Sequence, residues 1–389
     1  MKRIGIFLLL LCTGYGFAAQ VVRGPYLEDP TQNTLVMHWR TDERTPAWLE
    51  YGPQPRCNQV MKILPEGTEH KAILYGLIPN QDFCYRLYVY NTARTGLQAP
   101  VEGSFRTLYS PERKEIHFVA FGNTGGENPG AKALLSAQMA RQQADFAIHT
   151  GNLTASGLDA DADSEFFSPY RETLQSTPLF VALGLNEYGP DREKRDSKSF
   201  VRTNYSRFHD MSWSNATPKY YSFDTANARF IFLDANTAYG AVWAPDIDAK
   251  SNQYKWLQTT LAGAPEKWKI VVLNAPIYST GEQGPATEAA VRFTPLFERY
   301  GVKLVLQGGE ANYERTFPML KDAPNPRGVT YITLGGGGAT PKRRNGAHPS
   351  TARFVSNYHY ADVHITDRKL TIKVFNEQGK QIDTLDLYL

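Results

Sequence analysis

The alternation of strand-like and helix-like segments between residues 116 and 306 constrains the fold of this chain most strongly. Short apolar runs of the kind found in buried strands are separated there by longer segments with helical periodicity. This alternation predicts a layered α/β fold. An antiparallel hairpin is expected at residues 220–234, and further strands are expected from 329 to 387. The predicted strands are 116–121, 146–149, 179–183, 270–273 and 302–306, and the predicted helices are 132–142, 252–261 and 287–300.

Five loops rich in glycine and small polar residues follow these predicted strands. In open α/β sheets, ligands bind beyond the carboxyl ends of the strands. We therefore expect the five loops to meet at one edge of the sheet, where a functional site would lie. The loops are Gly122-Asn123-Thr124-Gly125, Gly151-Asn152, Gly184-Leu185-Asn186-Glu187, Asn274-Ala275-Pro276 and Gly308-Gly309-Glu310-Ala311.

Residues 21–107 have a different pattern, typical of an all-β unit. Short alternating runs at 35–39 and 85–90 are separated by turn-forming pairs such as Asp29-Pro30, which predicts a small β-sandwich. Cys57 and Cys84 both lie in this part of the chain. They can form a disulfide in an oxidising compartment, but the sequence does not show how far apart they are.

The first 18 residues predict a secretory signal peptide. Lys2 and Arg3 precede a short apolar run at 4–11, and small residues follow at 16–18, where cleavage is expected. The run is too short to span a bilayer, and we predict no membrane span elsewhere. The expected location is outside the cytoplasm: secreted, periplasmic or at the cell surface.

The charge balance excludes one class of partner. Removing Lys2 and Arg3 with the leader leaves 40 of the 42 basic residues against 39 acidic ones, a net charge of +1. This balance argues against nucleic acid as a partner and against binding to an anionic membrane surface. We interpret the basic cluster Lys342-Arg343-Arg344 as a solvated loop.

Motifs along nearly the whole mature chain resemble those of the purple acid phosphatases, a branch of the calcineurin-like metallophosphoesterases. Gly76-Leu77-Ile78-Pro79 and Phe105-Arg106-Thr107 resemble parts of that family's fibronectin-III-like domain, and the five loops resemble its five signature loops in order. The resemblance implies an α/β protein. It would have a fibronectin-III-like β-sandwich at 21–107 and a four-layer α/β/β/α metallophosphoesterase domain at 116–389.

The family uses two metals, iron with zinc, manganese or a second iron, to attack a phosphate monoester with a metal-bound hydroxide. We call the positions matching its metal ligands and catalytic histidine the signature positions. None of them carries the family's residue, although the flanking residues are retained. The metal-ligand positions hold Asn123, Asn152, Ala155, Leu185, Asn274, Gly309 and Ala311, and the catalytic-histidine position holds Asn186.

These substitutions predict loss of the dinuclear centre. Two cations need anionic ligands, and Asn123 and Asn152 retain the shape of aspartate without its charge. Leu185, Ala155 and Gly309 offer no donor atom. We therefore expect no metal ligand and no catalytic residue at these positions, and no metal cofactor. The expected protein is a pseudoenzyme.

Two functions remain open at this point. The first is a secreted, non-catalytic binding or scaffold protein with an unidentified protein or glycan partner. The alternative is an acid phosphatase with a weak or rebuilt metal site that uses His149 or Asp159 with nearby glutamates. The amides of the former site could bind a sugar or phosphate, or could only satisfy one another. The candidate ligand-binding residues are Asn123, Asn152, Asn186, Glu187, Asn274, Glu310 and His149.

Overall fold

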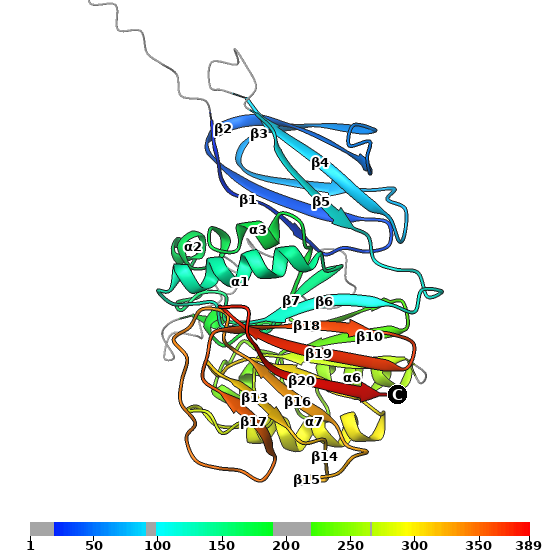
Figure 1. Ribbon diagram of the computed structural model, residues 1–389, viewed down its shortest axis with the longest axis vertical. Coiled ribbons are helices and arrows are strands. Elements are labelled where there is room, and N and C mark those ends of the chain that lie inside the picture. Colours follow the sequence, from blue (N-terminus) through cyan, green and yellow to red (C-terminus); the bar gives the residue numbers. More distant parts are fainter. Residues whose placement is uncertain (1–18, 91–98, 190–218, 265–266) are drawn as a thin grey trace, which may run out of the picture.

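The computed structural model describes residues 19–90, 99–189, 219–264 and 267–389. The predicted signal peptide at 1–18 lies outside the described residues. Figure 1 shows a β-sandwich at one end of the molecule and a larger layered α/β body below it. No helix within the described ranges is long and apolar enough to cross a membrane.

The N-terminal sandwich is organised around one long strand, β2. Its first half pairs with β1 and its second half with β4, while β3 runs antiparallel along both halves. Trp39 and Tyr85 are fully buried in the core enclosed by these strands. Cys57 and Cys84 form a disulfide with their Cα atoms 5.0 Å apart. The strands are β1 (Val21–Glu28), β2 (Leu35–Pro53), β3 (Val60–Leu74), β4 (Asp82–Val89) and β5 (Val101–Arg106).

The body contains two stacked sheets. In the first, three parallel strands lie beside three antiparallel ones in the order β20-β19-β18-β6-β7-β8, and in the second the order is β17-β13-β16-β12-β11-β10-β9. The first sheet comprises β6 (Ile116–Phe121), β7 (Phe146–His149), β8 (Leu179–Val181), β18 (His359–Ile365), β19 (Lys369–Asn376) and β20 (Gln381–Tyr388). The second comprises β9 (Tyr221–Thr225), β10 (Ala228–Leu233), β11 (Trp268–Leu273), β12 (Leu304–Gln307), β13 (Tyr313–Thr316), β16 (Thr330–Leu334) and β17 (Thr351–Val355).

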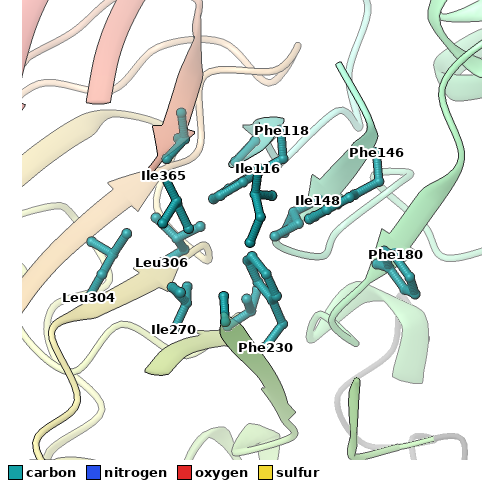
Figure 2. Close-up of a cluster of buried hydrophobic side chains, with 14 of the residues drawn as sticks. Ile116, Phe118, Phe146, Ile148, Phe180, Phe230, Ile270, Leu304, Leu306 and Ile365 are labelled. Carbon is teal, nitrogen blue, oxygen red and sulfur yellow. The ribbon is translucent and has the colours of Figure 1, made fainter. Parts of the chain in front are cut away.

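Apolar side chains fill the space between the two sheets. Phe118 and Phe146 from the first sheet face Phe230 from the second (Figure 2), with ring centroids 5.2 Å apart in each pair with Phe230. The strands that carry these side chains read as continuous apolar runs because they are covered on both faces. The hydrophobic core between the sheets therefore accounts for the strand predictions at 116–121 and 146–149.

Helices cover the outer face of each sheet. Helix α1 (Pro129–Gln142) begins at Asn128, whose Oδ1 accepts the N–H of Ala131 at 3.1 Å, and packs with α3 (Arg171–Leu174) on the first sheet. Helices α6 (Asn252–Ala262) and α7 (Thr287–Arg299) cover the second sheet. The shorter elements are α2 (Asp159–Ala162), η1 (Asp163–Phe167), η2 (Asn186–Tyr188), η3 (Asn236–Tyr239), β14 (Met319–Leu320) and β15 (Ala323–Pro324).

The predicted fold class is confirmed: an N-terminal β-sandwich precedes an α/β/β/α body. The antiparallel hairpin expected at 220–234 is β9 and β10. The sequence did not indicate that the two parts share a sheet edge, but Glu28 of β1 pairs in parallel with Leu179 of β8. Arg23 strengthens this junction by ion pairs to Asp159 and Asp163, with N···O distances of 2.8 and 2.5 Å.

Candidate functional site

The predicted loops meet at one edge of the body, beyond the carboxyl ends of the strands. The N–H of Asn123 donates to the carbonyl of Gly151 at 3.0 Å, and the N–H of Gly308 donates to the carbonyl of Leu273 at 3.0 Å. Together the loops enclose a pocket of about 430 Å³. It is lined by Asn123, Gly125, Asn152, Leu185, Asn186, Glu282, Gln283, Gly309, Glu310, Ala311, Ala339 and Lys342.

Backbone conformation explains why asparagine suits two signature positions. Asn123 and Asn152 both adopt the left-handed conformation, with φ of 52° and 61°. Among residues with a side chain, asparagine and aspartate tolerate this conformation best. The neighbouring glycines are needed for close packing, since a Cβ on Gly184 would lie 2.3 Å from the backbone nitrogen of Asn152. Asparagine therefore fits the backbone conformation of these two loops as well as aspartate would.

The amides of Asn123 and Asn152 are linked to each other. Oδ1 of Asn152 accepts the backbone N–H of Asn186 at 2.9 Å, which leaves Nδ2 of Asn152 to donate to Oδ1 of Asn123 at 3.2 Å. Nδ2 of Asn123 then makes no hydrogen bond to any of the described residues. Both residues line the pocket, so this N–H group remains available to a ligand.

Asn274 and Asn186 hold neighbouring loops in place. The Asn274 side chain is buried, its Nδ2 donates to the carbonyl of Thr150 at 2.8 Å, and its Oδ1 accepts the N–H of Leu185 at 3.2 Å. Asn186 donates from Nδ2 to the carbonyl of Thr154 at 3.0 Å. Asn274 therefore has a structural role, whereas Asn186 still lines the pocket.

Glu187 is a buried carboxylate surrounded by backbone donors. Oε2 accepts the N–H groups of Asn152 and Gly184 at 2.9 and 2.6 Å, and Oε1 accepts the N–H of Leu153 at 2.8 Å. These charge-assisted bonds connect the loops that follow β7 and β8. The carboxylate is therefore committed to loop structure.

Glu310 lines the pocket and has a similar structural role. Its Oε1 accepts the N–H groups of Gln283 and Gly284 at 2.7 and 2.8 Å and the hydroxyl of Ser279 at 3.4 Å. Burial raises the pKa of the Glu310 carboxyl above its ordinary value, and the backbone donors oppose that shift.

His149 and Asp159, the other candidates for a rebuilt metal site, have structural partners. Nδ1 of His149 accepts the N–H of Gly151 at 3.0 Å, and Nε2 lies 3.0 Å from the hydroxyl of Thr124. This hydroxyl donates to a backbone carbonyl at 2.7 Å, which makes Nε2 the protonated nitrogen. Asp159 forms the ion pair with Arg23 at the junction with the sandwich.

The remaining signature positions contribute no donor side chain to the pocket. Leu185, Gly309 and Ala311 line it, whereas Ala155 is exposed outside it. Lys342 lies at the pocket and pairs with Glu282, with 3.3 Å between Nζ and Oε2. The sequence alone indicates only a solvated loop at Lys342. The pocket therefore combines amide groups, apolar surface, the carboxylates of Glu282 and Glu310, and one partly exposed ammonium group.

A second group of residues, outside the pocket, has the donor atoms of a metal site. The ligand atoms of His117, Asp362 and His364 all lie within 4.8 Å of one another. The two imidazoles lower the pKa of the Asp362 carboxyl to about 2, although burial alone would raise it. The sequence does not reveal this group, because His117 and Asp362 are 245 positions apart. The alternating Asp362-Val363-His364 was the one local signal.

The chain is similar to known proteins in sequence and in structure. No family model matches the chain. The chain is 28% identical to purple acid phosphatase 21 of Arabidopsis thaliana over 324 residues, which cover 78% of this chain and 68% of that protein. The structure of purple acid phosphatase PPD1 from yellow lupin seeds is similar, with a TM-score of 0.76 and 17% identity, covering 95% of this chain and 74% of that one. The structure of GAP50, described as the anchor in the inner membrane complex of Plasmodium, has a TM-score of 0.56 and 19% identity, covering 71% and 90% respectively.

These findings correct one prediction. The expectation that the protein has no metal cofactor is wrong: its relatives are purple acid phosphatases, and the described residues include a group that could hold a metal ion. The prediction was drawn from the signature positions alone. It overlooked donor atoms that distant parts of the chain bring together on β6 and β18.

Proposed function

We propose that this chain, a purple acid phosphatase-like protein with a calcineurin-type metallophosphoesterase fold, has lost the dinuclear centre at its signature positions and acts as a non-catalytic binding or scaffold protein. The proposal concerns that centre alone and not metal binding elsewhere. The observation that carries it is the hydrogen-bonded link between Asn123 and Asn152, where a dinuclear enzyme needs carboxylates.

Charge is the physical argument. The dinuclear mechanism uses two closely spaced cations, and cations in a partly buried site need anionic ligands. Glu187 and Glu310 already accept hydrogen bonds from backbone N–H groups, and Glu282, which also lines the pocket, pairs with Lys342. Moving Glu187 or Glu310 onto a metal would leave backbone N–H groups without an acceptor, at a cost of about 1–3 kcal/mol for each group that is buried. The rebuilt-site alternative is therefore not favoured.

The pocket retains features suited to a polar ligand. Nδ2 of Asn123 can donate to a ligand, and Lys342, whose ammonium group pairs with Glu282, also lines the pocket. Together they fit a phosphate, a sugar or an acidic side chain of a protein partner. The description of GAP50 as an anchor supports a scaffold role for a protein of this fold.

We also propose that the protein is located outside the cytoplasm. The N-terminal leader motif supports export, and the Cys57–Cys84 disulfide is of the kind that persists in oxidising compartments. The partner would then be an extracytoplasmic protein or glycan.

An activity assay with matched variants tests the loss of the dinuclear centre. Hydrolysis of p-nitrophenyl phosphate is measured between pH 4 and 8 after iron, zinc and manganese have been offered to the untagged protein. We expect turnover no higher than that of the protein-free blank. Turnover that is abolished by N123A/N152A but retained by His364→Gln would contradict the proposal.

A binding assay tests the role of the pocket. Thermal-shift measurements with phosphate, nucleotides and glycans should identify a ligand whose stabilisation is reduced in Asn123→Ala. Stabilisation that is unchanged in that variant would show that the ligand binds elsewhere.

A further inference from the structure

The first sheet brings three potential metal ligands together at the end opposite the pocket. Asp362 and His364 are two positions apart on β18, so their side chains point to the same face of the sheet. His117 of β6 pairs directly with His364 in the antiparallel register. From His117 to Asn123 the chain spans about 20 Å if extended, which separates this cluster from the pocket.

The potential donor atoms of the three side chains lie close to one another. Nε2 of His117 lies 2.6 Å from Oδ1 of Asp362, and Nε2 of His364 lies 3.3 Å from Oδ2 of the same carboxylate. The two imidazole rings are stacked, with centroids 3.9 Å apart. Donor atoms in a tetrahedral zinc site lie about 3.3 Å apart, given metal–ligand distances of about 2.0–2.1 Å. The three side chains are therefore already close to the spacing that a metal ion requires.

The exposure of the three residues suits an open site. The Asp362 side chain is 7% exposed, that of His117 is 19% exposed and that of His364 is 50% exposed. The carboxylate is thus held firmly, while His364 has room to rotate. The two imidazoles lie on the rim of a cavity of about 290 Å³, which leaves space for water to complete the coordination shell.

The basic groups around this cavity already have partners. Arg106 pairs with Asp82 and Asp145, with N···O distances of 2.6 and 3.0 Å. The guanidinium of Arg113 lies 4.1 Å from the centroid of the Tyr109 ring. The exposed Lys373 pairs with Asp362 in the strand register, and its positive charge reduces the affinity for a cation. The carboxylates of Glu115 and Asp145 also line the cavity, so charged groups of both signs surround the three residues.

We propose that His117, Asp362 and His364 form a binding site for a divalent transition-metal ion such as Zn²⁺. Two imidazoles and one carboxylate are a donor set that zinc accepts, with water in the open position. For the ion to bind, the ring proton that each imidazole directs from Nε2 to Asp362 would move to Nδ1 or be released to solvent, which frees the Nε2 lone pair as the ligand. The ion then links β6 to β18.

Zinc calorimetry combined with elemental analysis tests the site in the untagged full-length protein at pH 7.5. We expect one zinc equivalent in the wild-type protein and a loss of at least about tenfold in affinity in His364→Gln and in Asp362→Asn. His364 is half exposed, so its replacement should leave the fold intact. His348→Gln is the matched control, because His348 is exposed and lies outside the cluster.

Two further measurements decide the outcome. The N123A/N152A variant should retain the zinc equivalent, because the proposed site does not use the signature positions. Saturating zinc should raise the melting temperature of the wild-type protein but not that of His364→Gln. Absence of zinc binding, equal affinity in His364→Gln, or loss of the equivalent in N123A/N152A would each overturn the proposal.

Discussion

The backbone N–H of Asn186 donates to Oδ1 of Asn152 at 2.9 Å, and this bond determines how the amides at two signature positions are oriented. A backbone N–H can only donate, so the atom that faces it must be an oxygen. Nδ2 of Asn152 is thereby directed at Oδ1 of Asn123, and Nδ2 of Asn123 is left for the pocket. The 3₁₀ turn Asn186–Tyr188 thus determines which amide atom of Asn123, two loops away, is left to bind a ligand.

Restoring aspartate at both positions should make the stability of the protein depend on metal. In N123D/N152D, two carboxylates would replace amide groups that are now 3.2 Å apart, and their repulsion is on the order of 5 kcal/mol at an effective dielectric constant of about 20. The free energy of unfolding should fall by that amount at pH 7.5 in EDTA. It should recover at pH 4, where the pair shares a proton, or when manganese is added.

The single variant Asn152→Asp is the control for this effect. The Asn123 amide can rotate so that Nδ2 donates to the new carboxylate. The free energy of unfolding of this variant should therefore fall only a little. Equal stability of the double and single variants in EDTA would show that the two side chains do not face each other as described.

Replacing Glu187 tests whether its carboxylate stabilises the loops by accepting their backbone N–H groups and does not bind a metal. In Glu187→Gln, an amide N–H would face a backbone N–H, and at least one of the bonds from Asn152, Leu153 and Gly184 would be lost. We expect a loss of about 1–3 kcal/mol in the free energy of unfolding, measured by urea denaturation. The exposed Glu127→Gln is the matched control and should change stability by less than about 0.5 kcal/mol.

Asp234 should make stability depend on pH. Burial raises the pKa of its carboxyl from 3.8 to about 6, although Tyr188 and Asn236 donate hydrogen bonds to it. Because the folded-state pKa is raised, the contribution of this group is fully present below about pH 4 and is lost as the pH rises through about 6. The loss amounts to about 3 kcal/mol, at about 1.4 kcal/mol per pKa unit.

The Asp234→Asn variant isolates that contribution. Denaturation of this variant and of the wild-type protein at pH 4, 5, 6 and 7 should show the variant gaining relative stability as the pH rises. Asp367→Asn, in which the replaced residue is 62% exposed, is the control and should show a smaller trend. A constant difference between Asp234→Asn and wild type at all pH values would rule out the assigned role.

Particular residues show how far the sequence could predict this structure. The strands at 116–121 and 146–149 match β6 and β7 to the residue, because strands covered on both faces need uninterrupted apolar runs. The meeting of the five loops at one edge followed from that topology. The roles of Glu187 and Glu310 could not be predicted, because they depend on where the backbone N–H groups of other loops point. The His117–His364 pairing depends on β18 lying beside β6 in the sheet, and no local sequence pattern indicates this long-range pairing.

Gly309 provides a last test, which asks whether its loop has room for a side chain. It stands at a signature position that holds histidine in the purple acid phosphatases, and its φ is 80°. A Cβ there would lie 2.8 Å from the carbonyl oxygen of Asn274 and 2.9 Å from Cδ of Pro276. Gly309→Ala should therefore be destabilised by backbone strain and by overpacking together.

Gly301→Ala supplies the control, because φ is 68° there and a Cβ would meet nothing within 4 Å. Both variants incur the left-handed penalty, of order 1–3 kcal/mol, so the extra loss in Gly309→Ala measures the overpacking, also about 1–3 kcal/mol. Equal losses in the two variants would mean that the loop can shift to admit a side chain, and that a histidine ligand could be restored at this position.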